Sequence, residues 1–310
     1  MGPEQRPFRF GVMIDTRRAT LADTLELARQ AEASGVSIVL GTDHLGRLAA
    51  LPLLQAVAQA TSLRIGTFVL NNDFRHPALL AQELATLDTV SAGRMEIGIG
   101  AGWERAEYEA AGMPFDEPAV RLTRMEASIR LLKQALSEGR MQHLGDASYP
   151  QIRMDGLPRS VQRPHPPILV GGGGKRLLGF AAREADIVAL NPRSLPGGGL
   201  DSNDVTEAAT DRKVDWVRQA AGSRWAELEL NAVVFEVDPE FRRRSGPPPP
   251  RRHGIDEEEL ARSPHYLAGD VEAMAEQLLA RRERWGISYS AVRGADLDSA
   301  ALVFRRLAGT

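Results

Sequence analysis

Short apolar runs rich in β-branched residues alternate with amphipathic segments along this chain. The run at 8–14 (FRFGVMI) is followed at 20–35 by a segment with apolar residues on one helical face. A short β-branched run is typical of a buried strand, and a stripe with a period near 3.6 residues is typical of a helix. Thr20 can cap this helix and Gly35 can end it. The pattern predicts one strand followed by one helix.

The same alternation continues through the rest of the chain. We expect seven further strands, at 36–42, 63–70, 94–100, 166–172, 186–190, 228–237 and 288–292. We expect helices after them at 48–61, 76–93, a longer region reaching 121–139, 175–185, 206–221, 270–286 and 298–308. Parallel strands need crossover helices, and eight strands close a ring. The predicted fold is therefore of the α/β class, a (β/α)8 TIM barrel.

The length of 310 residues suits one such barrel domain over 1–310. Loop insertions are expected near 138–165, 191–205 and 238–265. The last of these contains RRRSGPPPPRRHG, whose four prolines oppose helix and sheet, so a solvated excursion is expected. A lid over the barrel mouth is the alternative.

Composition excludes several classes of function. Charges of both signs are scattered and sum to −3, so we expect no nucleic-acid partner. The absence of cysteine excludes disulfides and thiolate sites, and no 18-residue apolar run or signal peptide is evident, so we expect a cytoplasmic protein away from membranes. The six histidines lack HxH or HExxH spacing and no GxSxG occurs, so neither a metal site nor an acyl-enzyme is expected.

Polar residues follow the second and third expected strands, at the barrel end that carries active sites. Asp43 and His44 leave the second strand together, and a histidine there can shuttle a proton near neutral pH. Asn71, Asn72 and Asp73 follow the third strand, and adjacent amides suit hydrogen bonding to a polar heteroaromatic ring. A capping role for the first pair and an ordinary turn for the second group are the alternatives.

Glycines follow the fourth and fifth expected strands. Gly100 and Gly102 precede Trp103, and alternate glycines let a flat ligand approach the backbone, although they also occur in tight turns. The four glycines 171–174 precede Lys175, at the expected start of a helix. Free backbone N–H groups, the helix dipole and the lysine together predict a phosphate cradle, with a structural turn as the alternative. The spacing matches neither a Walker loop nor a GxGxxG turn.

Three long stretches carry a resemblance to a known family. They are VLGTDHL, LRIGTFVLNNDFRHPALLAQELATLDTVSAGRMEIGIGAGW and PPILVGGGGKRLLGFAAREADIVAL, and SPHYLAGDVEAMAEQLLARRERWGISY is similar too. They resemble the bacterial luciferase-like superfamily, which comprises flavin-dependent monooxygenases and relatives that use the deazaflavin coenzyme F420. The resemblance implies a cofactor ring over strands two to four, a phosphate at the fifth-strand glycines, and a cis peptide at Phe68–Val69 in a bulge of strand three. It also implies a homodimer.

Finer similarity in RHPALLAQELATLD, GIGAGWERAEYEAAGMP and RRERWGISY favours the branch that uses coenzyme F420, with FMN as the alternative. That branch implies hydride transfer between the deazaflavin C5 and a small organic substrate. The anionic tail of this coenzyme could lie near Arg47, Lys175, Arg176 or Arg193. The other two interpretations of its function are an FMNH2-dependent two-component monooxygenase and a non-catalytic flavin-binding protein.

One departure from the family pattern concerns catalysis. Where the deazaflavin-dependent sugar-phosphate dehydrogenases carry a catalytic glutamate, this chain has Trp103, with Glu104 next. The candidate catalytic residues are His44, Asp73 and Trp103. The candidate cofactor-binding residues are Asp43, Phe68, Val69, Asn71, Asn72, Gly100, Ala101, Gly102, Gly171, Gly172, Gly173, Gly174, Lys175 and Asn191.

Overall fold

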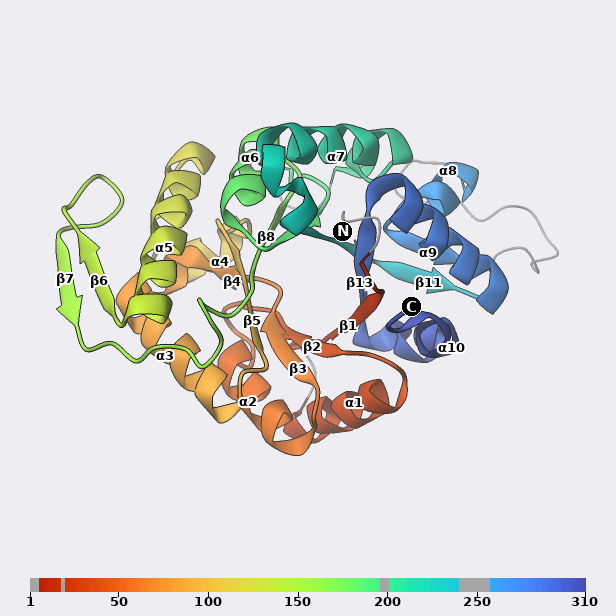
Figure 1. Cartoon of the computed structure of the whole chain (residues 1–310), viewed down its shortest axis with the longest axis horizontal. Coiled ribbons are helices and arrows are strands. Elements are labelled where there is room, and N and C mark those ends of the chain that lie inside the picture. The colour runs from red at the N-terminus through yellow and green to blue at the C-terminus, as the bar shows by residue number, and fades with distance from the viewer. Residues whose placement is uncertain (1–5, 18–19, 196–200, 240–256) are drawn as a thin grey trace.

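Eight parallel strands with helices outside them form a closed barrel in the computed structural model of this protein (Figure 1). The structure describes residues 6–17, 20–195, 201–239 and 257–310. In ring order the strands are β1 (Arg9–Met13), β2 (Ile38–Gly41), β3 (Arg64–Thr67) with its continuation β4 (Leu70–Asn71), β5 (Met95–Gly100), β8 (Ile168–Gly172), β9 (Ile187–Leu190), β10 (Glu229–Val234) and β13 (Ile287–Arg293). β1 pairs with β13, and β3 pairs with β5. The predicted (β/α)8 barrel is confirmed.

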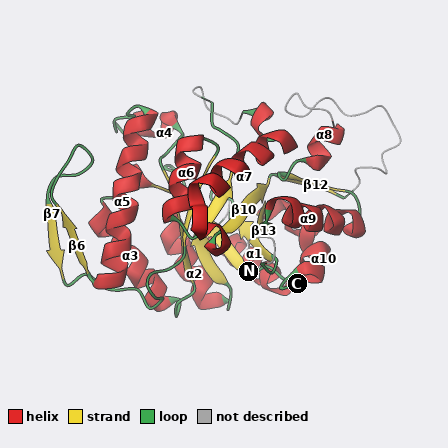
Figure 2. Ribbon diagram, turned by 45° about the horizontal axis from the view of Figure 1, so that its top comes forward, coloured by secondary structure: helices red, strands yellow, loops and turns green. Residues whose placement is uncertain are grey.

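Helices surround the strands, which lie in the middle of the molecule (Figure 2). They are α1 (Leu21–Ala33), α2 (Ala50–Ala60), α3 (Pro77–Val90), α4 (Arg105–Ala110), α5 (Pro118–Glu138), α6 (Lys175–Glu184), α7 (Glu207–Ala221), α8 (Glu257–Arg262), α9 (Val271–Trp285) and α10 (Leu297–Leu307). Thr20 caps α1 as predicted. Its side-chain oxygen accepts a hydrogen bond from the backbone N–H of Asp23, and the Asp23 carboxylate accepts one from the backbone N–H of Thr20. Gly35 follows this helix with a φ of +76°, which favours glycine. No helix in the described ranges is both long and apolar enough to span a bilayer.

The core has two parts, separated by the barrel wall. The larger part packs the outer faces of the strands against the helices. The smaller part joins residues of β2, β8, β9 and β13, strands from different sides of the ring, so they meet across the barrel interior. Its buried members are Ile38, Leu40, Leu169, Ile187, Ala189, Tyr289 and Ala291. The alternation of side chains along each strand sends one set inward and the other outward.

The third strand of the barrel carries an extra residue. Gly66 pairs with Glu96 and Leu70 pairs with Ile99, so four steps along one strand oppose three along the other. This two-against-one arrangement is a β-bulge, and it reverses the alternation of side chains after it. Leu70 consequently packs into the outer core, and Asn71 lies on the inner face. The expected strand 63–70 is thus two short strands, and the expected cis peptide at Phe68–Val69 is present between them.

Two short sheets lie outside the barrel and were not predicted. The expected insertion at 138–165 contains an antiparallel hairpin of β6 (Arg140–His143) and β7 (Ile152–Asp155), beside α5 in Figure 1. The expected strand 228–237 ends its barrel pairing at Val234, and β11 (Glu236–Asp238) pairs instead with β12 (Tyr266–Ala268). Residues 196–200 and 240–256, with the proline run and the lid considered for it, lie outside the described residues.

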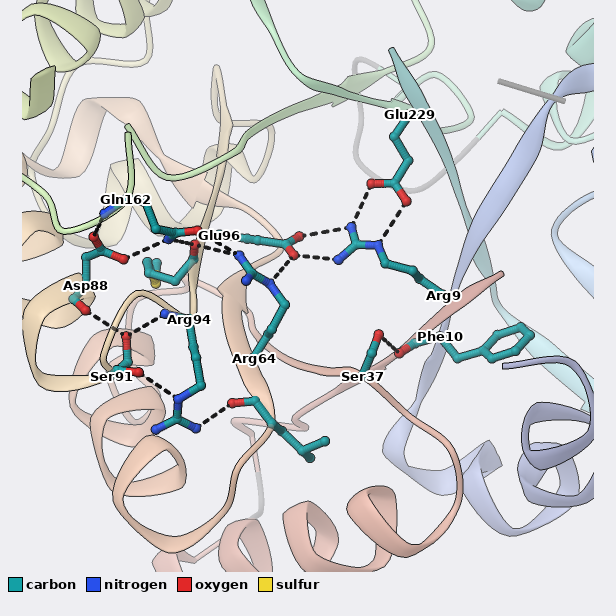
Figure 3. A network of polar contacts seen from close by, with 12 residues as sticks. Arg9, Phe10, Ser37, Arg64, Asp88, Ser91, Arg94, Glu96, Gln162 and Glu229 are labelled. Atoms are coloured by element: carbon teal, nitrogen blue, oxygen red, sulfur yellow. Dashed lines mark hydrogen bonds and ion pairs between the residues drawn. The ribbon is translucent and has the colours of Figure 1, made fainter. Parts of the chain in front are cut away.

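Buried ion pairs close the end of the barrel where the strands begin (Figure 3). Arg9 contacts Glu96 at 2.6 Å and Glu229 at 2.7 Å, and Arg64 contacts Glu96 at 2.8 Å. Burial favours the neutral form of Glu96, but the charges and hydrogen bonds of Arg9 and Arg64 outweigh it, so its pKa is lowered. Burial and the nearby carboxylates raise the pKa of Tyr289, and Arg9 lies over its ring. We call Arg9, Arg64, Glu96 and Glu229 the basal ion cluster.

Candidate functional site

The exits of the second and third strands are tied together by Asp43. Its carboxylate takes two hydrogen bonds from the Arg75 guanidinium, at 2.7 and 3.2 Å, and one from the backbone N–H of Asn71 at 3.1 Å. Burial acts to lower the pKa of Arg75, but the hydrogen bond and charge of Asp43 outweigh it and raise that pKa. Through these contacts Asp43 stabilises the rim, which fits the alternative of a capping role. Its contact with a cofactor stays a prediction.

The His44 side chain pairs closely with a carboxylate on the helix that follows the fourth barrel strand. Its Nδ1 lies 2.6 Å from Oε1 of Glu107, on α4, and the backbone N–H of Leu45 donates to the same carboxylate at 3.4 Å. The His44 and Glu107 side chains are 17% and 13% exposed. A carboxylate on Nδ1 fixes the tautomer and leaves Nε2 to exchange a proton with a ligand. The pair is therefore chemically suited to general acid or base work.

Trp103 stands beside this pair at the exit of β5. Its ring meets the His44 ring edge-on, with centroids 6.0 Å apart, and the side chain is 42% exposed. Edge-to-face packing limits the rotation of both rings and leaves an apolar surface facing solvent. The sequence indicated Trp103 as a candidate catalytic residue, and its role in the reaction stays a prediction.

The three polar residues at the exit of β4 have different surroundings. Asn71 accepts from the Tyr108 hydroxyl at 2.9 Å, and Asn72 donates to the Tyr149 hydroxyl at 3.2 Å while its Oδ1 is buried with no hydrogen-bond partner in the described chain. Asp73 takes two hydrogen bonds from Arg124, at 2.8 and 3.0 Å. These bonds raise the pKa of Arg124. They hold Asp73 toward α5, and a catalytic role for it stays a prediction.

The glycines of β5 and its exit make room for protein groups. A Cβ on Gly98 would overlap the backbone oxygen of Thr67, and one on Gly100 would lie 2.8 Å from Cγ2 of Val69. Gly102 has a φ of +78°, and a Cβ there would overlap the Tyr108 hydroxyl. The bulge and the tyrosine thus account for these glycines physically. Whether the rim at Gly100, Ala101 and Gly102 also contacts a ligand stays a prediction.

Three of the four glycines at the end of β8 are likewise required by packing. A Cβ on Gly171 would lie 2.8 Å from that of Ala189, one on Gly172 would overlap Leu177, and one on Gly173 would lie 2.5 Å from the backbone nitrogen of Arg193. Only with glycines can the exits of β8 and β9 approach so closely. A Cβ on the fourth, Gly174, would meet nothing within 4 Å.

The start of α6 offers an open set of donors. Its N-cap residue Gly174 provides no side-chain cap, so the first backbone N–H groups of the helix can bind an external acceptor. Lys175 is exposed and has no ion-pair partner within the described ranges, whereas Arg176 contacts Glu126 at 3.3 Å. This donor set fits a phosphate group.

The remaining candidate at this corner is Asn191, which follows β9. Its backbone N–H donates to Gly172 at 3.2 Å, and its buried Oδ1 has no hydrogen-bond partner among the residues described. Arg193, two residues later, is paired with Asp201 and Asp204. A buried acceptor without a partner is costly unless a ligand or water satisfies it. Asn191 therefore agrees with a polar ligand beside the glycines.

Several residues that build this rim were not singled out from the sequence: Glu107, Tyr108, Arg121 and Arg124. A signal for the first two was present, because both follow the strand-four glycines within one short stretch, GWERAEY. The arginines lie on α5 among many other charged positions. Nothing in the spacing of α5 distinguishes arginines that face the rim from those that face solvent.

The chain matches known proteins over most of its length. The family model described as luciferase-like monooxygenase matches residues 6–223. An FMNH(2)-dependent dimethylsulfone monooxygenase of Pseudomonas putida is 31% identical over 164 residues, which are 53% of this chain and 42% of that protein. An F420-dependent glucose-6-phosphate dehydrogenase of Kineococcus radiotolerans is 30% identical over 231 residues, 68% of this chain and 67% of that protein. The matches thus span about half to two thirds of these relatives' own lengths.

The fold is also found among solved structures. The coenzyme F420-dependent tetrahydromethanopterin reductase of Methanopyrus kandleri superimposes with a TM-score of 0.73 at 20% identity, over 96% of this chain and 97% of that one. At this identity the likeness establishes a shared barrel and nothing about the ligand.

Proposed function

Because the chain belongs to the luciferase-like monooxygenase family, we propose that it is a coenzyme F420-dependent oxidoreductase. It would transfer a hydride between the deazaflavin C5 and a small organic substrate. Relatives that use a flavin-type cofactor support an oxidoreductase. The choice of the deazaflavin rests on the finer sequence similarity of the rim segments.

The observation that carries the proposal is the pair of His44 and Glu107 beside the exposed Trp103. A substrate that accepts a hydride at carbon gains negative charge on an adjacent atom and needs a proton there. His44 can deliver that proton through Nε2, because Glu107 stabilises the charged imidazolium at Nδ1. In the oxidation direction the same nitrogen receives the proton. Trp103 would exclude water from one side of the reacting atoms.

The bound deazaflavin would supply the hydride chemistry, and the protein would supply its binding, orientation and electrostatics. The N–H groups at the start of α6, with Lys175, would hold the phosphate. The unpartnered Oδ1 atoms of Asn72 and Asn191 would accept hydrogen bonds from a bound polar molecule. Of the four cations considered for the anionic tail, Arg47 and Lys175 have no ion-pair partner in the described residues, which supports those two over Arg176 and Arg193.

An anaerobic titration tests the proposal. The purified protein is titrated separately with coenzyme F420 and with FMN, and tryptophan quenching and cofactor fluorescence are followed. We expect micromolar binding of the deazaflavin and much weaker binding of FMN. The reverse preference would assign the protein to FMNH2-dependent oxygenation, the second candidate, which the similarity to the dimethylsulfone monooxygenase favours. Binding of neither cofactor would refute the phosphate cradle.

The role of His44 is tested by His44→Ala, compared with His165→Ala. His165 precedes β8, at the end of the barrel where the strands begin, and its Nδ1 lies 2.9 Å from the carbonyl oxygen of Pro166. We expect the His44 variant to bind the cofactor normally and to turn over about 100-fold more slowly, the usual scale of general acid catalysis. The His165 variant should match the wild type. Unchanged turnover in His44→Ala would remove the histidine from the mechanism.

A further inference from the structure

Glu107 reaches His44 from α4, a helix of only six residues, Arg105–Ala110. Such a helix is marginal on its own, and α4 has no side-chain cap at its N-terminus. Its orientation must therefore come from tertiary contacts. The neighbouring residue Tyr108, about 100° further around the helix, is fully buried and makes those contacts.

Tyr108 joins α4 to the exit of the third strand. Its hydroxyl lies 2.9 Å from Oδ1 of Asn71 and 3.1 Å from Oδ2 of Asp73. Its ring packs against Phe74 and Phe115, with centroids 5.4 and 4.8 Å away. Burial and the charge of Asp73 raise the pKa of Tyr108, so the hydroxyl remains a donor at any working pH.

A second set of contacts joins α5 to the loop between the fourth strand and α4. Arg121, on α5, donates to the backbone oxygens of Ala101 at 3.2 Å and Gly102 at 3.3 Å. Its guanidinium also lies 3.9 Å from the centroid of Phe115, the ring that supports Tyr108. The loop that carries Trp103 and the start of α4 is thus held between α5 and the strand exits.

We propose that Tyr108 is a positioning residue, which locks α4 onto the strand exits so that Glu107 meets His44 and fixes its tautomer. The inference depends on the proposed function only for the reaction that the pair serves. The pairing itself is a property of the free protein. Its test can therefore fail or succeed independently of cofactor and substrate.

The test compares Tyr108→Phe with Tyr149→Phe. Tyr108→Phe leaves no acceptor without a donor, because Asn71 still accepts from the backbone of Asp73 and Asp73 still accepts from Arg124. Tyr149→Phe is matched, since it removes another buried rim hydroxyl that contacts an asparagine, Asn72. Both variants should fold.

The readout is the low-field proton resonance of the His44 Nδ1–H in histidine-labelled protein, identified by its loss in His44→Ala. A hydrogen bond to a carboxylate slows the exchange of this proton with water. We expect Tyr108→Phe to exchange it at least tenfold faster, and Tyr149→Phe to leave it unchanged. Asn71→Ser, which removes the acceptor of the Tyr108 hydroxyl, should act like Tyr108→Phe and serves if that variant fails to fold.

Two results would overturn the inference. One is an unchanged resonance in both Tyr108→Phe and Asn71→Ser, which would mean that α4 is positioned without the hydroxyl. The other is an equal acceleration of the His44 Nδ1–H exchange in Tyr108→Phe and Tyr149→Phe, which would indicate general loosening of the rim. With a working assay, Tyr108→Phe should lower kcat about tenfold at unchanged cofactor affinity. Absent activity in the wild type would then count against the proposed function and leave the resonance result intact.

Discussion

Replacing Glu96 by glutamine removes the central charge of the basal ion cluster. Its carboxylate is 4% exposed and contacts Arg9 at 2.6 Å and Arg64 at 2.8 Å. Removing one partner of a buried pair costs about 3–5 kcal/mol, because the other charge stays buried. Arg9 still has Glu229 as a partner, and the Arg9 and Arg64 side chains are 24% and 30% exposed, so we expect the lower end of this free-energy range. We expect about 3 kcal/mol, which corresponds to a melting temperature about 5 °C lower in a chain of this size.

The effect should depend on pH in a definite direction. The pKa of Glu96 is lowered in the folded protein from its ordinary value of 4.5. The stabilisation from its charge is therefore fully present above pH 4.5 and disappears as the pH falls through the folded-state pKa. Thermal unfolding followed by circular dichroism should show a constant difference between wild type and variant from pH 6 to 8. The difference should shrink below pH 4.5.

Glu26→Gln provides the matched control. Glu26 is an exposed carboxylate, 60% accessible, that lies 3.6 Å from Arg29 on the same helix. An exposed pair of this kind contributes little, so the melting temperature should change by less than about 1 °C. The reasoning is refuted if Glu96→Gln melts within 1 °C of the wild type at pH 7. It is also refuted if the gap keeps its size below pH 4.5.

Four further substitutions, one of them a control, test the rim glycines and the phosphate site. Gly173→Ala should lower the melting temperature by several degrees, because the new Cβ would lie 2.5 Å from the backbone nitrogen of Arg193. Gly174→Ala should leave the melting temperature unchanged. Equal melting temperatures of the two variants would contradict the packing account. Gly98→Ala should reduce the yield of folded protein, as measured by circular dichroism, since the new Cβ overlaps backbone, and a normal melting curve would show that the bulge can shift. Lys175→Ala should weaken cofactor binding about fivefold in a fluorescence titration without altering melting, and unchanged affinity would move the phosphate elsewhere.

The barrel was predictable from the sequence because its strands are buried on both faces. Such strands appear as short continuous apolar runs, and the runs ending at Met13, Gly41 and Leu190 were all recognised. The run at 63–70 was equally apolar, and its division by a bulge depends on the pairing with β5, which no local pattern encodes. The hairpin at 140–155 was missed because its strands, RMQH and IRMD, have little apolar content.

The candidate site was predictable as a set of rim positions but not as a set of pairs. Strand exits are common to every barrel of this kind, so Asp43, His44 and Asp73 could be placed near one another. Their partners lie far away along the chain. Arg75, just before α3, contacts Asp43 at a separation of 32 residues, and Arg124, on α5, contacts Asp73 at a separation of 51 residues. Which acid meets which base is decided by side-chain geometry after the chain has closed. The sequence alone therefore could not show that Arg124 binds Asp73.

The odd residue in the third strand has a consequence for how this protein can be altered or can evolve. Between Gly66 and Leu70 the chain has one residue more than the strand beside it. Deleting a single codon there would leave three steps opposite three and remove the bulge. Leu70 would still face the helices and Asn71 the interior, but Phe68 and Val69 could no longer both pack against the inner core. Substitutions in this stretch change one side chain at a time, but the loss of one residue removes the bulge itself and with it the two adjacent inward-facing side chains. Library design and loop grafting on this scaffold should accordingly treat the number of residues from 66 to 70 as fixed.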